Sequence, residues 1–425
     1  MRGDLSAVPA FISNKFPDFA ARLDSDGPLS VAVSGGGDSV ALLYALVAWR
    51  KRPLEVFCVD HGLNPLSPQW TQSVADHAAR LGVGFTALHW GDEKPQTGLS
   101  AAARLARHRL LAEAARQKGI SVLCLAHTAD DIAEAKVMRG QGSSVGAPKV
   151  WAPSPVWPEG RGVFLYRPFL DIRRDALRDY LRGIGVGWID DPANESPHSL
   201  RARTRKALQD EQTPVAPVET GVQLSPVQLE MLLYRSESLA PLGLIAFQAD
   251  RFHALPNETA VRLLATAAVC AGGGDKLPRQ EKVSALLAQL PSGKAQTLSG
   301  ARLYQADGVI FIGREAGDIG RNRAGQVSMT DGETVWDGRF AIRAVAGEIV
   351  ASHAARAQLS DDDRTWLSSL PAMARGSQPV LEQKDNLDKP LLTNPALRHF
   401  EVKCLVFPRF RAAMGMIRRE SDVTG

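Results

Sequence analysis

The first 210 residues alternate between short apolar runs and longer stretches whose apolar positions have helical spacing. Runs such as LSVAV (29–33) and LEVFCVD (54–60) are almost continuously apolar, which is typical of strands buried on both faces. We expect strands over 29–33, 54–60, 83–90, 121–127 and 163–168, and helices over 38–51, 69–81, 99–118, 128–139 and 172–185.

This alternation predicts an α/β fold, a doubly wound parallel sheet with helices on both faces. Ligands of such sheets bind beyond the carboxyl ends of the strands. We therefore expect functional residues in the turns that follow Val33, Asp60, His127 and Pro168.

Beyond residue 210 the pattern changes twice. A Pro- and Thr-rich connection over 209–226 leads into a helical pattern over 224–292, and glycine-punctuated short strands follow. We predict three parts: an N-terminal domain over 1–210, a mainly helical domain over 211–315 that ends in short strands, and a small β-rich region over 316–425.

The composition is that of an ordinary globular protein of 425 residues, 44% hydrophobic and 23% charged. The net charge of +4 permits an anionic partner without requiring one. The four cysteines, Cys58, Cys124, Cys270 and Cys404, occur singly, which argues against a zinc ribbon or a redox pair. No apolar run approaches the roughly 20 residues of a membrane helix, and the N-terminus lacks a signal-peptide core, so we expect a cytoplasmic protein with no membrane partner.

The segment SGGGDS (34–39) lies between the first expected strand and the first expected helix. Backbone N–H groups at a helix start bind anions, and glycine lets a phosphate come close because no Cβ intervenes. The segment has no Walker lysine, no GxGxxG spacing and no GxSxG elbow. A plain turn capped by Asp38 or Ser39 is the alternative, but such a turn rarely needs three glycines. We expect this segment to bind phosphate.

His127, Asp131 and Glu134 stand at positions i, i+4 and i+7, so on a helix they share one face. Because His127 ends an expected strand, this face lies at or beside the ligand edge of the sheet. The Thr128-x-x-Asp131 spacing is also that of a helix cap, and the spacing alone leaves both interpretations open. The pattern matches no recognised zinc spacing.

SGGGDS resembles the pyrophosphate loop of the N-type ATP pyrophosphatases, the PP-loop superfamily, whose members adenylate a substrate. Within that superfamily, further stretches resemble the tRNA(Ile)-lysidine synthetases, although His108, Thr128 and Ala135 replace the usual tyrosine, histidine and threonine. The matching stretches are VDHGLNPLSPQW (59–70), AAARLARHRLL (101–111), AHTADDIAEAKVMRGQG (126–142), RPFLDIRRDALRDYL (167–181) and WIDDPANES (188–196).

The resemblance implies a ligase that uses ATP and Mg²⁺. Such an enzyme adenylates C2 of the wobble cytidine in the isoleucine tRNA with a CAU anticodon, and L-lysine then displaces AMP to give lysidine. The modified tRNA reads AUA in place of AUG. A thiolase-like or amidotransferase-like member of the superfamily is one alternative, and a binding protein with a degenerate loop is another. The absence of cysteine in motif positions and of a glutaminase elbow argues against the former.

The resemblance also assigns roles to residues. His127, Asp131 and Glu134 are expected to surround the attacking lysine or the reacting base, with the two carboxylates holding or deprotonating the ε-amine. Asp38 is expected to be catalytic by holding magnesium. The competing interpretation for Asp38 is that it caps a helix, and for the arginines that they form solvent-exposed basic helix faces. A homodimer is left open. Expected ATP ligands are Ser34, Gly35, Gly36, Gly37, Asp38, Ser39, Asp60, His61, Arg104 and Arg107, and expected substrate ligands are Arg139, Arg201, Arg203 and Arg205.

Overall fold

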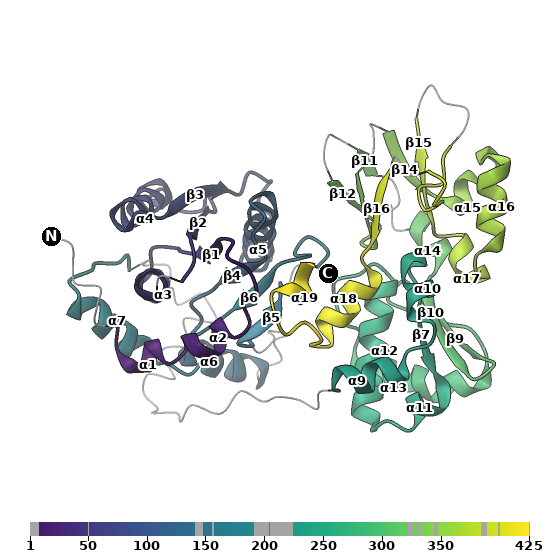
Figure 1. The fold of residues 1–425 in the computed structure, drawn as a ribbon, viewed down its shortest axis with the longest axis horizontal. Coiled ribbons are helices and arrows are strands. Elements are labelled where there is room, and N and C mark those ends of the chain that lie inside the picture. Colours follow the sequence, from purple (N-terminus) through teal and green to yellow (C-terminus); the bar gives the residue numbers. More distant parts are fainter. Residues whose placement is uncertain are drawn as a thin grey trace. The chain divides into compact units, whose positions relative to one another are not determined.

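The chain divides into two compact units in the computed structural model (Figure 1). Unit 1 comprises Met1–Thr220 together with Ile417–Gly425, and unit 2 comprises Gly221–Met416. The structure describes residues 8–49, 51–140, 148–154, 157–190, 204, 224–321, 327–329, 333–343, 347–383, 389–397 and 400–424.

Unit 1 is built on a six-stranded sheet with the order β3-β2-β1-β4-β6-β5. All neighbouring strands are parallel except β5, which runs antiparallel to β6 at one edge. The five predicted strands are confirmed, whereas β5 was not predicted. The strands are β1 (Leu29–Ala32), β2 (Leu54–Asp60), β3 (Gly84–His89), β4 (Val122–Cys124), β5 (Trp151–Pro153) and β6 (Phe164–Tyr166).

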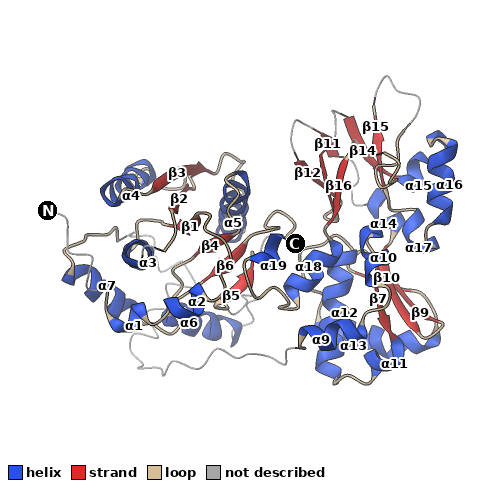
Figure 2. Ribbon diagram, viewed as in Figure 1, coloured by secondary structure: helices blue, strands red, loops and turns tan. Residues whose placement is uncertain are grey.

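Helices cover both faces of this sheet, as the doubly wound class requires (Figure 2). Successive residues of β2 point to opposite faces: Val56 and Cys58 pack with α3, α4 and α7, whereas Phe57 packs with α5. The helices are α1 (Ala10–Ser13), α2 (Phe16–Ala20), α3 (Gly37–Trp49), α4 (Ser67–Leu81), α5 (Leu99–Gln117), α6 (Ala129–Gly140), α7 (Arg174–Gly183) and α19 (Ser421–Thr424).

The point where the strand order reverses determines where ligands bind in such a sheet. Here β1 lies between β2 and β4, so the connections after β1 and after β4 leave the sheet beside each other. SGGGDS follows β1, and His127 follows β4. The two strongest sequence signals therefore lie at one carboxyl edge.

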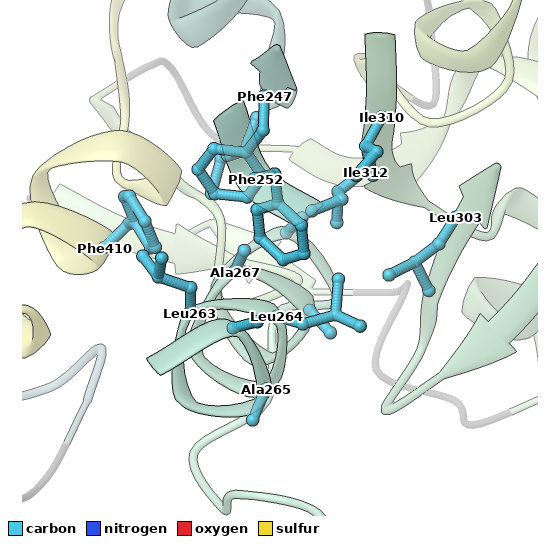
Figure 3. Close-up of a cluster of buried hydrophobic side chains, with 14 of the residues drawn as sticks. Phe247, Phe252, Leu263, Leu264, Ala265, Ala267, Leu303, Ile310, Ile312 and Phe410 are labelled. Atoms are coloured by element: carbon cyan, nitrogen blue, oxygen red, sulfur yellow. The ribbon is translucent and has the colours of Figure 1, made fainter. Parts of the chain in front are cut away.

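The first part of unit 2 is an antiparallel sheet of order β7-β10-β9-β8, packed on α12. Figure 3 shows this core, in which Phe247, Phe252 and Ile310 belong to the same buried cluster as Leu264 of the helix. The predicted helical pattern over 224–292 is interrupted by β7, a strand too short to show a clear alternation. The elements are α9 (Pro226–Leu232), α10 (Ser236–Leu239), β7 (Ile245–Gln248), α11 (Ala249–His253), α12 (Asn257–Ala271), α13 (Gln280–Gln289), β8 (Gln296–Leu298), β9 (Ala301–Ala306) and β10 (Val309–Arg314).

The remainder of unit 2 is mixed α/β, with three-stranded sheets of order β11-β14-β15 and β12-β13-β16. The three-part division of the chain stays a prediction, and its boundary near 210 lies outside the described residues. Among the described residues no helix is both long and apolar enough to cross a membrane. The elements are α14 (Ala316–Arg321), β11 (Val327–Met329), β12 (Glu333–Trp336), β13 (Phe340–Arg343), β14 (Gly347–Ala351), α15 (Ser352–Ala355), α16 (Asp361–Ser369), α17 (Ala372–Arg375), β15 (Pro379–Glu382), β16 (Glu401–Cys404) and α18 (Val406–Ala413).

Candidate active site

The glycine-rich loop needs its first glycine for two separate reasons. Gly35 has φ +89°, a conformation that L side chains rarely adopt, and a Cβ there would lie 2.6 Å from Ile189 Cδ1. The Ile189 backbone N–H also donates to the Gly35 carbonyl at 2.9 Å. The segment that contains Trp188 and Ile189 therefore fixes the shape of the loop.

Ser39 closes the loop from its other end. Its hydroxyl donates to the Gly36 carbonyl at 2.8 Å and accepts from the Ser34 N–H at 3.2 Å. Helix α3 begins at Gly37, so the N–H groups of its first turn have no carbonyl partner within the helix. These donors lie just beyond the end of β1, which is the arrangement expected for an anion site.

Three carboxylates converge on one arginine at this edge. The Arg174 guanidinium lies 3.0 Å from Asp38 Oδ2, 3.8 Å from Asp131 Oδ1 and 3.6 Å from Glu134 Oε1. All four side chains are largely buried. The acids come from the first turn of α3 and from α6, and Arg174 opens α7. We call these four residues the acid cluster.

Asp38 has the properties of a cation ligand. Burial raises the pKa of its carboxyl, and the Arg174 charge opposes this rise. Its Oδ1 is buried without a hydrogen-bond partner among the described residues. No group of three or more His, Cys, Asp or Glu side chains in the described part of the chain is arranged to hold a metal. A cation at Asp38 would therefore take most of its ligands from phosphate oxygens and water, as magnesium commonly does.

Asp131 also stabilises the start of helix α6. Its Oδ2 accepts from the Thr128 N–H at 2.8 Å and from the Thr128 hydroxyl at 3.0 Å. The capping interpretation of this spacing is therefore confirmed. The other carboxylate oxygen faces Arg174, and a functional role for Asp131 stays a prediction. The hydrogen bonds fix the direction in which Asp131 presents its second oxygen.

His127 is a neutral ring whose proton can be placed. Arg167 Nε donates to His127 Nδ1 at 3.1 Å, and because arginine only donates, the proton of the neutral imidazole lies on Nε2. Burial, and then the Arg167 charge, lower the pKa of His127 to about 3, although Asp131 opposes this. At neutral pH His127 therefore offers a hydrogen-bond donor and not a base.

Asp60 and His61 lie at the end of β2, as predicted. Burial alone would raise the pKa of Asp60, but hydrogen bonds from Ser67 and from the Gly62 N–H at 2.8 Å lower it overall. Burial, and then the Arg107 charge, lower the pKa of His61. Arg107 of α5 is thus close to His61.

Of the remaining predicted arginines, two lie in described parts of the chain and three do not. Arg104 is exposed on α5, and Arg139 is exposed near the end of α6. Arg201, Arg203 and Arg205 lie outside the described residues. Sequence reasoning gave no role to Arg167 and Arg174, although both lie in a stretch that resembles the family. The available signal was an arginine near the end of an expected strand.

The fold and the loop define the class of protein. The family model described as "PP-loop domain" matches residues 11–212. The chain is 40% identical over 418 residues to the tRNA(Ile)-lysidine synthase of Caulobacter vibrioides, which covers 94% of this chain and 97% of the relative. It is 34% identical to the tRNA(Ile)-lysidine synthase of Mesorhizobium japonicum, over 92% and 91% of the two chains. The chain therefore belongs to the tRNA(Ile)-lysidine synthase family, which confirms the resemblance seen in the motifs.

Proposed function

We propose that this protein is a tRNA(Ile)-lysidine synthase: it adenylates C2 of the wobble cytidine in the CAU-anticodon isoleucine tRNA and replaces AMP with L-lysine. One observation carries the proposal. Asp38, Asp131 and Glu134 converge on Arg174 at the end of the glycine-rich loop, in a chain similar to such synthases over nearly its whole length.

The glycine-rich loop is the proposed site of the ATP phosphates. Its amides would bind phosphate oxygens at the start of α3, and Asp38 would hold Mg²⁺ through Oδ1, which has no hydrogen bond to a described residue. When bound, the ion neutralises phosphate charge. In this step the O2 oxygen of cytidine forms a bond to the α-phosphorus, and the bond to pyrophosphate breaks. Asp60, His61, Arg104 and Arg107 stay predicted ATP ligands.

The acid cluster is the proposed site of the attacking ε-amine. The amine must be neutral to attack C2, so a neighbouring group must accept its proton. Asp131 and Glu134 are suited to this role, whereas the Nδ1 lone pair of His127 is held by Arg167. The new C–N bond forms as the C2–O bond breaks, and AMP leaves with the oxygen. His127 would then orient a reacting group through its Nε2 proton.

The tRNA would approach the same edge. Arg139 and the segment with Arg201, Arg203 and Arg205 stay predicted phosphate contacts, since cationic side chains bind the RNA backbone. Cytoplasmic location and a homodimer stay predictions from the sequence.

A labelling experiment tests the proposed function. The protein is incubated with ATP, Mg²⁺, labelled L-lysine and the isoleucine tRNA transcript. The control transcript carries uridine in place of the wobble cytidine, and the control protein is Asp38→Ala. We expect label only in the first transcript with the unmodified protein, with AMP and pyrophosphate formed in equal amounts to the label. Label in no transcript, or in both, contradicts the proposal.

A further inference from the structure

Arg167 is a buried cation without a carboxylate partner among the described residues. It follows β6 directly and is only 5% exposed. Its Nε donates to His127 Nδ1, and one terminal nitrogen donates to the Lys149 carbonyl at 2.9 Å. The other terminal nitrogen, Nη2, makes no hydrogen bond to a described residue. Buried charges are normally paired, because removing an ion from water is costly.

The neighbours of Arg167 increase the positive charge. After burial, the charges of Arg104 and Arg107 are what lower the pKa of Arg167, to about 9. The same two arginines act on His108, which is 1% exposed and whose ring nitrogens both lack a hydrogen-bond partner among the described residues. We call Arg104, Arg107 and Arg167 the basic cluster. It lies beside two imidazoles that burial keeps neutral.

Such a cluster calls for an anionic ligand. Its three guanidiniums come from α5 and from the turn after β6, all at the edge where ligands bind. A guanidinium with an open terminal nitrogen binds the oxygens of a carboxylate or a phosphate. The described surroundings of Arg167 supply no such oxygen, so the ligand would bring it.

The position of the basic cluster selects the kind of anion. His127 contacts Arg167 and also lies within reach of the Asp131 charge, so one residue borders both the basic cluster and the acid cluster. A ligand that spans both must be negative at one end and positive at the other. A triphosphate is negative throughout, whereas free lysine has a carboxylate and an ε-ammonium at opposite ends.

We propose that the basic cluster, centred on Arg167, binds the α-carboxylate of the incoming lysine while the acid cluster receives its ε-amine. The proposal rests on the proposed function and names the site that selects lysine. It moves the carboxylate contact from Arg139, which is exposed, to a buried arginine, and it gives Arg104 and Arg107 this role in place of ATP binding.

The test compares L-lysine with L-lysinamide, which lacks the carboxylate charge, in the unmodified protein and in Arg167→Gln. We expect the unmodified protein to show a KM for lysinamide about 10- to 100-fold above that for lysine, the range of a charged hydrogen bond. In Arg167→Gln the KM for lysine should rise to that for lysinamide, while the KM values for ATP and tRNA stay unchanged. A merely structural role would raise the KM of both amines equally.

Three results would overturn the proposal. Arg167→Gln still prefers lysine to lysinamide, or it loses affinity for both equally, or its KM rises for ATP or tRNA alone, which would make the anion a phosphate. Arg167→Lys, which keeps the charge without the planar fork, should retain part of the preference and serves if the glutamine variant does not fold. Failure of the unmodified protein to label any tRNA is a separate result, which rejects the proposed function itself.

Discussion

Two arginines seven positions apart at the same sheet edge have opposite surroundings. Burial alone would lower the pKa of Arg174, but the carboxylates of Asp38, Asp131 and Glu134 raise it. Burial, together with the charges of Arg104 and Arg107, lowers the pKa of Arg167 to about 9. The same residue type thus neutralises a surplus of acids in one place and adds to a surplus of positive charge in the other. The carboxyl edge of the sheet therefore has an acidic part and a basic part, which suits a ligand with a positive charge at one end and a negative charge at the other.

A third buried arginine of unit 1 shows what a structural pairing looks like. Arg52 precedes β2, at the amino edge of the sheet, and its two terminal nitrogens lie 2.7 and 2.9 Å from the two carboxylate oxygens of Glu420. Glu420 also accepts from the hydroxyls of Ser25 and Ser121. Both charges of this pair are neutralised and hydrogen-bonded within the protein. The pair is therefore the structural reference with which the two arginines at the carboxyl edge are compared.

The largest effect should come from Asp38→Ala, which removes the acid nearest to Arg174. Because Asp38 is the proposed magnesium ligand, the loss amounts to several kcal/mol of transition-state stabilisation, about a 1,000-fold fall in the rate of tRNA-dependent pyrophosphate release. Asp171→Asn, an exposed carboxylate paired with Lys15, is the matched control and should keep the full rate. Pyrophosphate release at the unmodified rate in Asp38→Ala would remove Asp38 from the mechanism.

Arg174→Gln should both destabilise the protein and move its pH profile. Three buried acids lose their counter-charge, at a cost of about 3 kcal/mol of unfolding free energy. Arg174 lowers the pKa of Asp38 against the effect of burial, so without it this pKa rises and the acid limb of the rate profile moves to higher pH.

Arg52→Gln is the control for this variant. It breaks a comparably buried pair and should lower stability by a similar amount, yet leave the pH profile in place. Thermal unfolding and initial rates between pH 5 and 9 measure both effects. If Arg52→Gln shifts the profile as much as Arg174→Gln does, the two arginines do not differ in function.

Glu134→Ala should separate the two chemical steps. If Glu134 accepts a proton from the amine, lysine transfer falls about 100-fold, while adenylation, measured as pyrophosphate release, continues. Adenylated tRNA should then accumulate in a single-turnover experiment. Equal losses in both steps would place Glu134 at the phosphates, and lysine transfer at the unmodified rate would exclude it from the site.

These differences explain what the sequence could predict. The strands of the parallel sheet are apolar runs and were predicted, whereas β5 is a three-residue edge strand that ends in Pro153 and has no such pattern. Asp131 and Glu134 were found because helical periodicity sets their spacing on α6, and His127 because it ends an expected strand just before that helix. Arg167 and Arg174 were given no role because their partners come from segments 40 to 136 residues away. Whether a buried arginine meets a carboxylate depends on how those segments pack, which spacing along the chain does not encode.

The smallest effect should come from His127→Asn. Asparagine keeps an acceptor for Arg167 and a donor for the reacting group, so exchanging neutral hydrogen bonds should change the rate of lysine transfer by less than about tenfold. His127→Ala, which leaves Arg167 Nε without its acceptor, should cost more. A loss in His127→Asn as large as that in Glu134→Ala would make His127 a base and contradict the placement of its proton.

The same variant should change how stability depends on pH. In the folded protein the pKa of His127 is about 3, against 6.5 for an unperturbed ring. Between these values the unfolded state binds more protons, so the presence of His127 lowers stability as pH falls through this range. His127→Asn removes that penalty, and its stability relative to the unmodified protein should rise from pH 7 to pH 4.5 in denaturant unfolding. If both proteins lose stability in parallel as the pH falls, His127 takes up its proton in the folded state as readily as in the unfolded state. Arg167 then does not donate to its Nδ1 at the lower pH.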